Sequence, residues 1–223
     1  MGKLIAIDGV DASGKQTHCE LLYEKLIKNG IKARKISFPM YESNSSALVK
    51  MYLSGEFGDK PEDVSAYAAS SFFAADRFAT YKTDWGKDYN SDTVIIADRY
   101  VSSNMIHQAS KLSGDEKNKF LEWLDHFEHE IYALPRSDIT IFLDMPPEYG
   151  AMLMKDRENK FSKESQKDIH ERNKEYLTES YKNACFIAQK YNWKKISCVK
   201  DNAIRTIDEI NDEIYNIIIS TIL

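Results

Sequence analysis

The sequence predicts an α/β fold in which helices cover both faces of a parallel five-stranded sheet. Two observations support this prediction. Short apolar runs of about five residues recur along the chain, and segments with helical spacing of apolar residues lie between them. Continuous apolar strands are typical of parallel sheets that are buried on both faces. No Pro/Gly/Ser-rich linker or change in composition divides the 223 residues, so we expect one domain over residues 1–223.

The expected elements follow from local signals in chain order. A helix is expected to end at Gly30, because glycine commonly follows the last turn of a helix, and Gly114 interrupts a later helical stretch. Strands are expected at 3–8, 31–37, 93–97, 139–143 and 195–199. Helices are expected at 15–29, at 62–80, up to about 132, up to about 191, and at 204–219.

Charge and composition limit the classes of partner. The chain carries 30 Lys and Arg against 35 Asp and Glu, for a net charge of −5, which argues against broad binding to nucleic acid or to an anionic membrane. No apolar run approaches the roughly 18 residues of a membrane span, and the beginning of the sequence lacks the pattern of a signal peptide. Cys19, Cys185 and Cys198 show no metal-ligand spacing. We therefore expect reduced thiols and a cytoplasmic protein that binds small molecules.

A phosphate-binding loop is expected between the first strand and the first helix, where the sequence reads GVDASGK. Gly9 and Gly14 have no Cβ, so the backbone can curl until several N–H groups point at one anion. The helix N-terminus adds partial positive charge, and Lys15 can neutralise phosphate oxygens. The residues expected to bind ATP are Gly9, Val10, Asp11, Ala12, Ser13, Gly14, Lys15, Gln16 and Thr17.

The magnesium ligand is left open by the sequence. A Ser or Thr that ligates Mg²⁺ usually follows the lysine of such a loop, but Gln16 stands there. An amide oxygen can ligate a hard cation, and Thr17 is one residue further on. Asp98, at the end of the third expected strand, is another candidate. The loop predicts a three-layer P-loop NTPase fold that uses ATP and Mg²⁺.

Five segments resemble thymidylate kinases, in the order and at the spacing of that family. They are IDGVDASGK at the start, SFP at 37–39, FFAADRF at 72–78, DRYVSSN at 98–104 and ITIFLDMPPE at 139–148. The resemblance extends from residue 3 to about residue 199. It implies transfer of the ATP γ-phosphate to thymidine monophosphate (dTMP), and a homodimer. The alternatives are a kinase for another nucleoside monophosphate or for a deoxynucleoside, and a P-loop protein that does not transfer phosphate.

The helix at FFAADRF can also be examined by its geometry. At about 100° per residue, Phe73 and Arg77 lie one turn apart, opposite a face of small side chains. A ring that stacks and a guanidinium that bonds an exocyclic oxygen would suit a nucleobase. Helical geometry alone is equally consistent with Phe73 packing in the core and Arg77 pairing with a carboxylate. The resemblance favours the base site. The small face comprises Val64, Ala68, Ser71, Ala75 and Ala79.

The resemblance implies further contacts to the acceptor nucleotide. Arg99 would bind its phosphate, with an Asp98–Arg99 ion pair as the alternative. Asp11 would approach its sugar. The remaining acceptor contacts implied are Phe38, Asn104 and His107, and His107 replaces an aromatic residue common in relatives. Tyr41 stands where some relatives have a phosphate-binding arginine.

The Lys-rich stretch at 155–167 matches the family's lid by position. Some thymidylate kinases carry a catalytic arginine in the phosphate loop, where this chain has Ala12. A cation from the lid is therefore expected to act at the transferring phosphoryl group. Arg157 is the first choice, and Lys15, Arg99 and Arg157 form the expected catalytic set. The alternative is a solvated helix end. Further lid candidates are Lys155, Lys160, Lys163 and Lys167, followed by the acidic Asp168 and Glu171.

Overall fold

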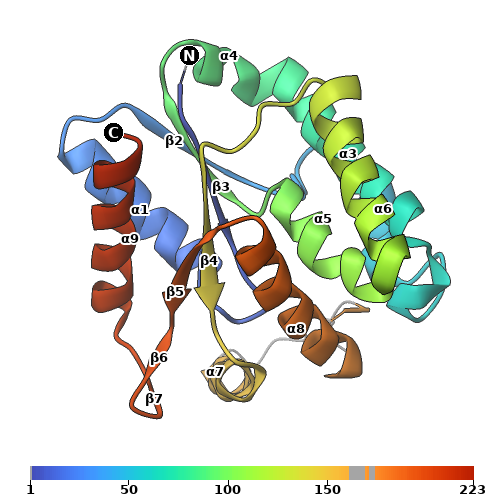
Figure 1. Cartoon of the computed structure of the whole chain (residues 1–223). Helices are drawn as coiled ribbons and strands as arrows, with labels where there is room; N and C mark the ends of the chain where they lie inside the picture. Colours follow the sequence, from blue (N-terminus) through green and yellow to red (C-terminus); the bar gives the residue numbers. More distant parts are fainter. Residues whose placement is uncertain (1, 161–168, 171–173) are drawn as a thin grey trace.

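The computed structural model describes the backbone of residues 2–160, 169–170 and 174–223, with side chains except at 155–160 and 174. Its centre is a five-stranded parallel sheet in the order β2-β3-β1-β4-β5. The predicted α/β fold is confirmed (Figure 1). The strands are β1 Leu4–Asp8, β2 Ala33–Ser37, β3 Val94–Asp98, β4 Ile139–Asp144 and β5 Lys194–Ser197.

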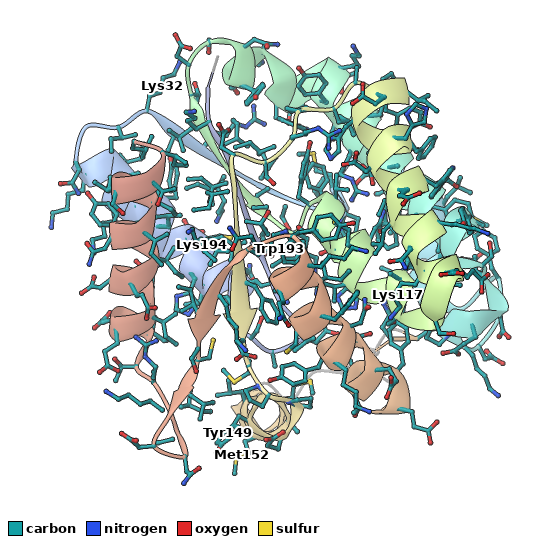
Figure 2. The ribbon with its side chains drawn as sticks, viewed as in Figure 1. Lys32, Lys117, Tyr149, Met152, Trp193 and Lys194 are labelled. Atoms are coloured by element: carbon teal, nitrogen blue, oxygen red, sulfur yellow. The ribbon has the colours of Figure 1, made fainter. Side chains whose placement is uncertain are left out.

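The sheet separates two apolar cores, because successive side chains of a strand point to opposite faces. Leu4 and Ala6 of β1 join one core, and Ile5 and Ile7 join the other. All residues of β1 and β4 are buried, which explains why their sequences are mostly apolar. Figure 2 shows side chains filling the space on both sides of the sheet, with Trp193 just before β5.

The helices form the outer two layers. On one side of the sheet lie α1 (Lys15–Lys28) and α9 (Ile207–Thr221), which contact each other (Figure 1). On the other side lie α3 (Ala66–Thr80), α5 (Val101–His107), α6 (Gly114–His126) and α8 (Lys174–Lys190). The remaining helices are α2 (Ala47–Ser54), α4 (Gly86–Asn90) and α7 (Pro147–Lys160), with 3-10 turns at Asn44–Ser46, Pro61–Asp63 and Ala109–Lys111 and π-helical turns at Tyr81–Trp85 and Phe127–Ile131.

Two predicted helix starts are wrong, and capping explains both. The helix expected at 62–80 begins at Ala66, because the Ser65 hydroxyl accepts the Ala68 N–H and so starts the helix there. Val64 is therefore not part of the small face of α3. The last helix begins at Ile207 rather than at 204, behind a capping box formed by Thr206 and Glu209.

A short hairpin precedes that last helix. The strand expected at 195–199 ends at Ser197, and β6 (Val199–Lys200) then pairs antiparallel with β7 (Ala203–Ile204). Asp201 and Asn202 make the turn with φ of 51° and 60°, a region that Asn and Asp tolerate better than most residues. No helix in the described part of the chain is long and apolar enough to cross a membrane.

Candidate active site

The phosphate loop lies at the carboxyl end of β1, between Asp8 and the first residue of α1. The backbone is left-handed at Gly14, with φ of 84°. A Cβ on Gly9 would lie 2.7 Å from Ser13 Oγ and 2.8 Å from the Leu143 carbonyl oxygen, so only glycine fits there. The loop can therefore curl as the sequence predicts.

Lys15 folds back over this loop. Its side chain is buried, and its Nζ donates to the Val10 carbonyl oxygen at 2.8 Å. Burial and the nearby Arg99 charge lower the pKa of Lys15 to about 8, so the ammonium remains largely charged at neutral pH. A buried cation held against the backbone of the loop is suited to bind a phosphate chain.

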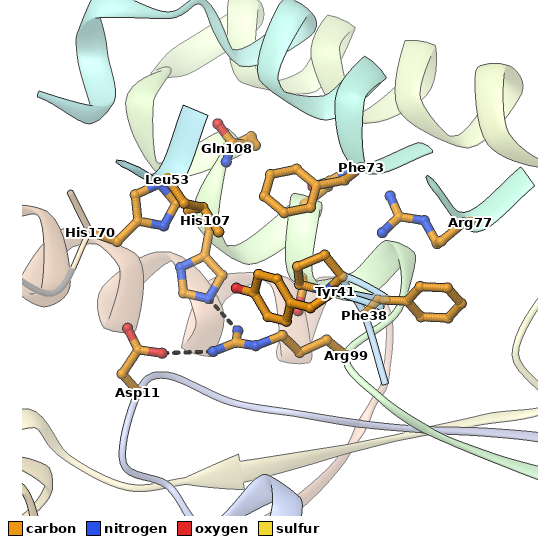
Figure 3. Close-up of a pocket in the computed structure, with 13 residues that line it drawn as sticks. Asp11, Phe38, Tyr41, Leu53, Phe73, Arg77, Arg99, His107, Gln108 and His170 are labelled. Atoms are coloured by element: carbon orange, nitrogen blue, oxygen red, sulfur yellow. Dashed lines mark hydrogen bonds and ion pairs between the residues drawn. The ribbon is translucent and has the colours of Figure 1, made fainter. Parts of the chain in front are cut away.

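One pocket beside the loop gathers all of the predicted acceptor contacts (Figure 3). They arrive from separate elements: Asp11 from the loop, Phe73 and Arg77 from α3, and Asn104 and His107 from α5. Six other lining residues were not predicted as acceptor contacts, and none of them lies in the helix around Phe73. The full lining is Asp11, Phe38, Pro39, Tyr41, Leu53, Phe73, Arg77, Arg99, Ser103, Asn104, His107, Gln108 and His170.

Arg99 joins the loop to this pocket. Its guanidinium pairs with Asp11 at 2.7 Å and bonds His107 Nε2 at 3.1 Å, so the alternative Asp98–Arg99 ion pair does not occur. Although burial raises the pKa of Asp11, the charges of Arg99 and Lys15 hold it below its ordinary value. Burial and the Arg99 charge lower the pKa of His107. The pocket floor thus presents one carboxylate, one guanidinium and one neutral imidazole.

Arg77 lies at the other end of the pocket in a buried ion pair that the sequence did not identify. Its Nε and Nη2 donate to Glu128 at 2.7 and 2.5 Å, and the two side chains are 1% and 0% exposed. Glu128 also accepts from Asn104 Nδ2 at 3.3 Å. The carboxylate therefore orients two pocket residues at once. Arg77 both pairs with a carboxylate and lines the pocket, so the two alternatives considered from the sequence are compatible.

Asp8 connects the phosphate loop to α5. It is fully buried and accepts the Gly9 N–H at 2.9 Å, the Ser102 hydroxyl at 2.8 Å and the Ser103 hydroxyl at 2.8 Å. Ser102 and Ser103 lie in the first turn of the helix that carries Asn104 and His107. One carboxylate thereby fixes the distance between the loop and α5.

A second pocket opens on the opposite side of the loop, next to α9. Its walls are mainly apolar, and it includes Arg205, which pairs with Glu213 at 2.7 Å and donates to the Ser197 carbonyl oxygen at 2.8 Å. The sequence predicted the loop residues of this pocket but not its other wall, because no motif marks the hairpin and helix start that form that wall. The lining is Ala12, Ser13, Gly14, Thr17, His18, Met145, Leu153, Ile204, Arg205, Ile207 and Ile210.

The predicted metal ligands lie close to the loop. Gln16 is exposed in the first turn of α1, whereas Thr17 faces the second pocket. Burial raises the pKa of Asp98, and the Lys15 and Arg99 charges oppose that shift, which places this carboxylate near both cations. Among the described residues, no group of three or more His, Cys, Asp or Glu side chains could hold a metal ion alone.

The lid candidates cannot be compared with this geometry. The side chains of Lys155, Arg157 and Lys160, near the end of α7, lie outside the described residues. The whole of Lys163, Lys167, Asp168 and Glu171 also lies outside them. His170, to which sequence reasoning gave no role, is described and lines the same pocket as Asp11, Phe73 and Arg99.

A phosphate loop with a buried lysine, next to two pockets at the carboxyl ends of parallel strands, is typical of a P-loop phosphotransferase. Comparison with known proteins narrows this class. Residues 7–202 match the family model of thymidylate kinase, and the chain belongs to that family.

Relatives from distant organisms agree with this assignment. The chain is 34% identical to a thymidylate kinase of Mycobacterium tuberculosis (strain H37Rv) over 146 residues, which are 65% of this chain and 67% of the relative. It is 30% identical to a probable thymidylate kinase of Sulfolobus acidocaldarius over 97% of this chain and 96% of the relative. A thymidylate kinase structure from Candida albicans shares the fold, with a TM-score of 0.71, 23% identity and coverage of 98% and 92%.

Proposed function

We propose that the chain transfers the γ-phosphoryl group of ATP to dTMP, giving ADP and dTDP, with the residue roles described below. The observation that carries this proposal is that every predicted acceptor contact lines one pocket beside the phosphate loop, while a separate pocket opens on the other side. In-line phosphoryl transfer needs two nucleotides held with their phosphates facing each other, and mostly positioning and charge stabilisation.

The acceptor nucleotide would occupy the pocket that contains Asp11, Phe73 and Arg99, which we call the acceptor pocket. Phe73 would stack on the base and Arg77 would bond an exocyclic oxygen, with Glu128 holding the rest of the guanidinium in place. Arg99 would bind the acceptor phosphate, and Asp11 would approach the sugar. The Asp11–Arg99 ion pair would then keep sugar and phosphate contacts at a fixed separation.

The donor nucleotide would place its base in the second pocket, which we call the donor pocket. There the base would lie against Arg205, whose guanidinium is already oriented by Glu213. Its phosphates would follow residues 9–17, where Lys15 and the N-terminus of α1 supply positive charge. Thr17 faces the donor pocket, so its hydroxyl is suited to the donor side of the phosphate chain rather than to the metal.

Magnesium fits the oxygen groups at this edge. Asp98 is a partly buried carboxylate whose pKa is raised by burial, and a divalent cation nearby would favour its charged form. Asp98 and the Gln16 amide oxygen would hold Mg²⁺ together with the nucleotide phosphates. The ion would neutralise charge on the phosphate oxygens.

The lid would supply the remaining charge. Ala12 offers no cation from within the loop, and Arg157 would approach the transferring phosphoryl group when the lid closes. Closure would also exclude water and so suppress ATP hydrolysis.

A homodimer is part of the proposal. Ala68, Ser71, Ala75 and Ala79 form a half-buried stripe on α3, narrow enough for a helix of a second copy to pack closely. Beside it, half-buried rings extend from Trp123 through Phe127 and Tyr132 to Phe78, with centroids 4.5 to 5.0 Å apart. We also propose a cytoplasmic location, which the three unpaired cysteines support.

A coupled assay of ADP release tests the function. The chain is supplied with ATP, Mg²⁺ and, separately, dTMP, dUMP, dCMP, dGMP and thymidine. We expect dTMP to have the highest kcat/KM and thymidine to react poorly, because it lacks the phosphate that Arg99 would bind. Preference for another monophosphate would replace the proposed acceptor, and ADP release independent of every acceptor would replace phosphoryl transfer by hydrolysis.

A further inference from the structure

A further cavity lies at the amino ends of the strands, at the opposite edge of the sheet from the phosphate loop. We call it the amino-end cavity. Ile139 and Lys194, the first residues of β4 and β5, line it, whereas the loop follows the last residue of β1. Strands rise about 3.3 Å per residue, so about 15–20 Å of sheet separates the two sites. Its volume of about 310 Å³ is within the range of small-molecule sites, about 300–1,000 Å³.

Helix α5 separates this cavity from the acceptor pocket. Val101, Ser102 and Met105 line the amino-end cavity, whereas Asn104 and His107 of the same helix line the acceptor pocket. No residue assigned above to dTMP, ATP or Mg²⁺ lines the amino-end cavity. A ligand held there would therefore be additional to the two substrates.

Aromatic and apolar side chains form much of the wall. Tyr191 and Trp193 come from the loop between α8 and β5, and Leu124 and Met105 come from the helices opposite. The half-buried Trp193 side chain packs against two apolar clusters, so its ring is held in place. In the described part of the chain its indole N–H has no hydrogen-bond partner. The wall therefore offers a ring surface together with an unused donor.

The acidic groups of the cavity are already paired with cations of the protein. Arg136 donates to both carboxylate oxygens of Asp125. Asp138 pairs with Lys3 at 2.9 Å and also accepts the Leu4 N–H at 2.8 Å. Neither carboxylate is left to attract a cationic ligand.

Lys194 is the unpaired charge of this lining. Among the described residues it has no ion-pair or hydrogen-bond partner. Burial lowers the pKa of the other basic group, His129, so its imidazole is neutral at neutral pH. Figure 2 shows Lys194 and Trp193 next to each other at the start of β5. One free ammonium beside one free indole N–H favours a ligand with a negative group.

We propose that the amino-end cavity binds a planar aromatic ring that carries an anionic group. The ring would pack among the aromatic and apolar walls, and the anion would be bonded by Lys194 and by the indole N–H of Trp193. A nucleotide and a free aromatic acid share this chemistry. The proposal does not depend on the function proposed for the active site.

The test compares two probes that differ in charge alone, 1-naphthoate and the neutral 1-naphthamide. Calorimetry is done on the full chain with both active-site pockets filled by an excess of a bisubstrate analogue, adenosine and thymidine joined by five phosphates. We expect one 1-naphthoate per chain, and about three- to tenfold weaker binding of 1-naphthamide. In Lys194→Met both probes should bind with the affinity that the parent has for 1-naphthamide. The control Lys200→Met, exposed in β6, should keep the difference.

The indole N–H signals in a nitrogen–proton NMR spectrum locate the bound probe. The chain has three tryptophans, and Trp193→Phe identifies the signal of Trp193 by its loss. Addition of 1-naphthoate should move that signal and leave those of Trp85 and Trp123, which do not line the cavity. Titrations with AMP and with 4-hydroxybenzoate then distinguish a nucleotide from a free aromatic acid as the occupant. Whichever binds should bind more weakly to Lys194→Met.

Several results would overturn the proposal. They are no binding of 1-naphthoate to the parent at millimolar concentration, equal affinities of the parent for the two probes, an unchanged difference in Lys194→Met, and movement of the Trp85 or Trp123 signal alone. Lys194 is exposed on an edge strand, so its variants should fold, and Lys194→Gln replaces Lys194→Met if that variant does not. Failure of the bisubstrate analogue to bind would count against the proposed function only, because the probes can then be titrated into the free protein.

Discussion

The two pockets beside the phosphate loop are built on different principles. The acceptor pocket holds its charged groups in fixed pairs, Arg99 with Asp11 and Arg77 with Glu128. The donor pocket has mainly apolar walls and one arginine, and its other contacts to a nucleotide would come from the loop. Oriented polar groups discriminate strongly between ligands, whereas apolar walls discriminate weakly. We therefore expect selectivity for the acceptor base and broader tolerance for the donor base.

The largest expected effect concerns the carboxylate that organises the acceptor pocket. Glu128→Gln would leave the Arg77 charge buried without its counter-ion, and we expect a loss of about 3–5 kcal/mol in the free energy of unfolding. Urea denaturation measures it. Glu130→Gln is the control, because its pair with Arg136 is exposed and should contribute about 1 kcal/mol or less. Similar values for the two variants would contradict a buried, coupled pair.

Lys15→Ala tests the phosphate loop, whose residues contribute to both pockets. Removing the ammonium should lower turnover by about 10²-fold or more, because the charge acts on the transferring group rather than on either base. Steady-state kinetics with dTMP and ATP measure the change. Lys28→Ala, exposed in the last turn of the same helix, should behave as the parent. Turnover within a few-fold of the parent in Lys15→Ala would disprove the proposed mechanism.

Substitutions at the base end of the acceptor pocket should weaken the binding of dTMP and not that of ATP. Phe73→Ala should weaken dTMP binding by about 1–3 kcal/mol through lost stacking and leave ATP binding nearly unchanged. Phe72→Ala is the control, since Phe72 packs on Phe57 and does not line the pocket. Arg77 is best removed with Glu128, as Arg77→Met and Glu128→Leu together, because this avoids an unpaired buried charge. Calorimetry measures both affinities, and parallel losses for ATP and dTMP would indicate a folding defect.

Histidines at both pockets should make the protein sensitive to mild acid. Burial lowers the pKa of His18, beside the donor pocket, to about 4 and that of His170, in the acceptor pocket, to about 3. Below about pH 6.5 the histidines of the unfolded chain bind protons, whereas these folded imidazoles do not. The free energy of unfolding therefore decreases as the pH decreases. Each histidine should contribute up to about 1.4 kcal/mol per pH unit between pH 6.5 and 5, with little change above pH 7. Urea midpoints at four pH values measure the slope, and His18→Gln should reduce it; an equal slope in that variant would refute the role of His18.

The smallest expected effect concerns Arg157 of the lid, which could contact either the transferring phosphoryl group or the adenine of ATP. If Arg157 acts on the phosphoryl group, Arg157→Ala should lower turnover several-fold with little change in the ATP Michaelis constant. If it stacks on adenine, the Michaelis constant should rise while turnover holds. Arg157→Lys separates charge from the planar guanidinium. If neither constant changes, the same measurement is made on alanine variants of Lys160 and Lys163. Unchanged kinetics in all of the lid variants would refute the proposal that the lid replaces a loop arginine.

Much of this architecture could be predicted because its signals are local. Short, mostly apolar segments predicted the parallel sheet, and the spacing of Gly9, Gly14 and Lys15 predicted the phosphate loop. The predicted acceptor contacts came from the resemblance of short segments to thymidylate kinases. Their presence in a single pocket could not be deduced from helical periodicity, which left Arg77 between a base contact and an ion pair.

What could not be predicted depends on partners far apart in the chain. Glu128 lies 51 residues from Arg77, in a helical turn where a carboxylate resembles any exposed acid. The donor pocket needs Arg205 next to the loop, and only the packing of α9 against α1 brings them together. Gln108 follows a helix end without any motif, and only the folded chain places it in the acceptor pocket.

The bonds of Asp8 bear on how this enzyme could be rebuilt. Since that carboxylate is shared between the Gly9 amide and the hydroxyls of Ser102 and Ser103, the loop and the start of α5 form a single transplantable unit despite about 90 residues of intervening chain. A chimera that exchanged the loop with Asp8 but took α5 from a scaffold without these hydroxyls would carry an unsatisfied buried acid beneath its phosphate site. Grafts that move the donor and acceptor halves separately would therefore have to recreate this junction before altered nucleotide preferences could be selected.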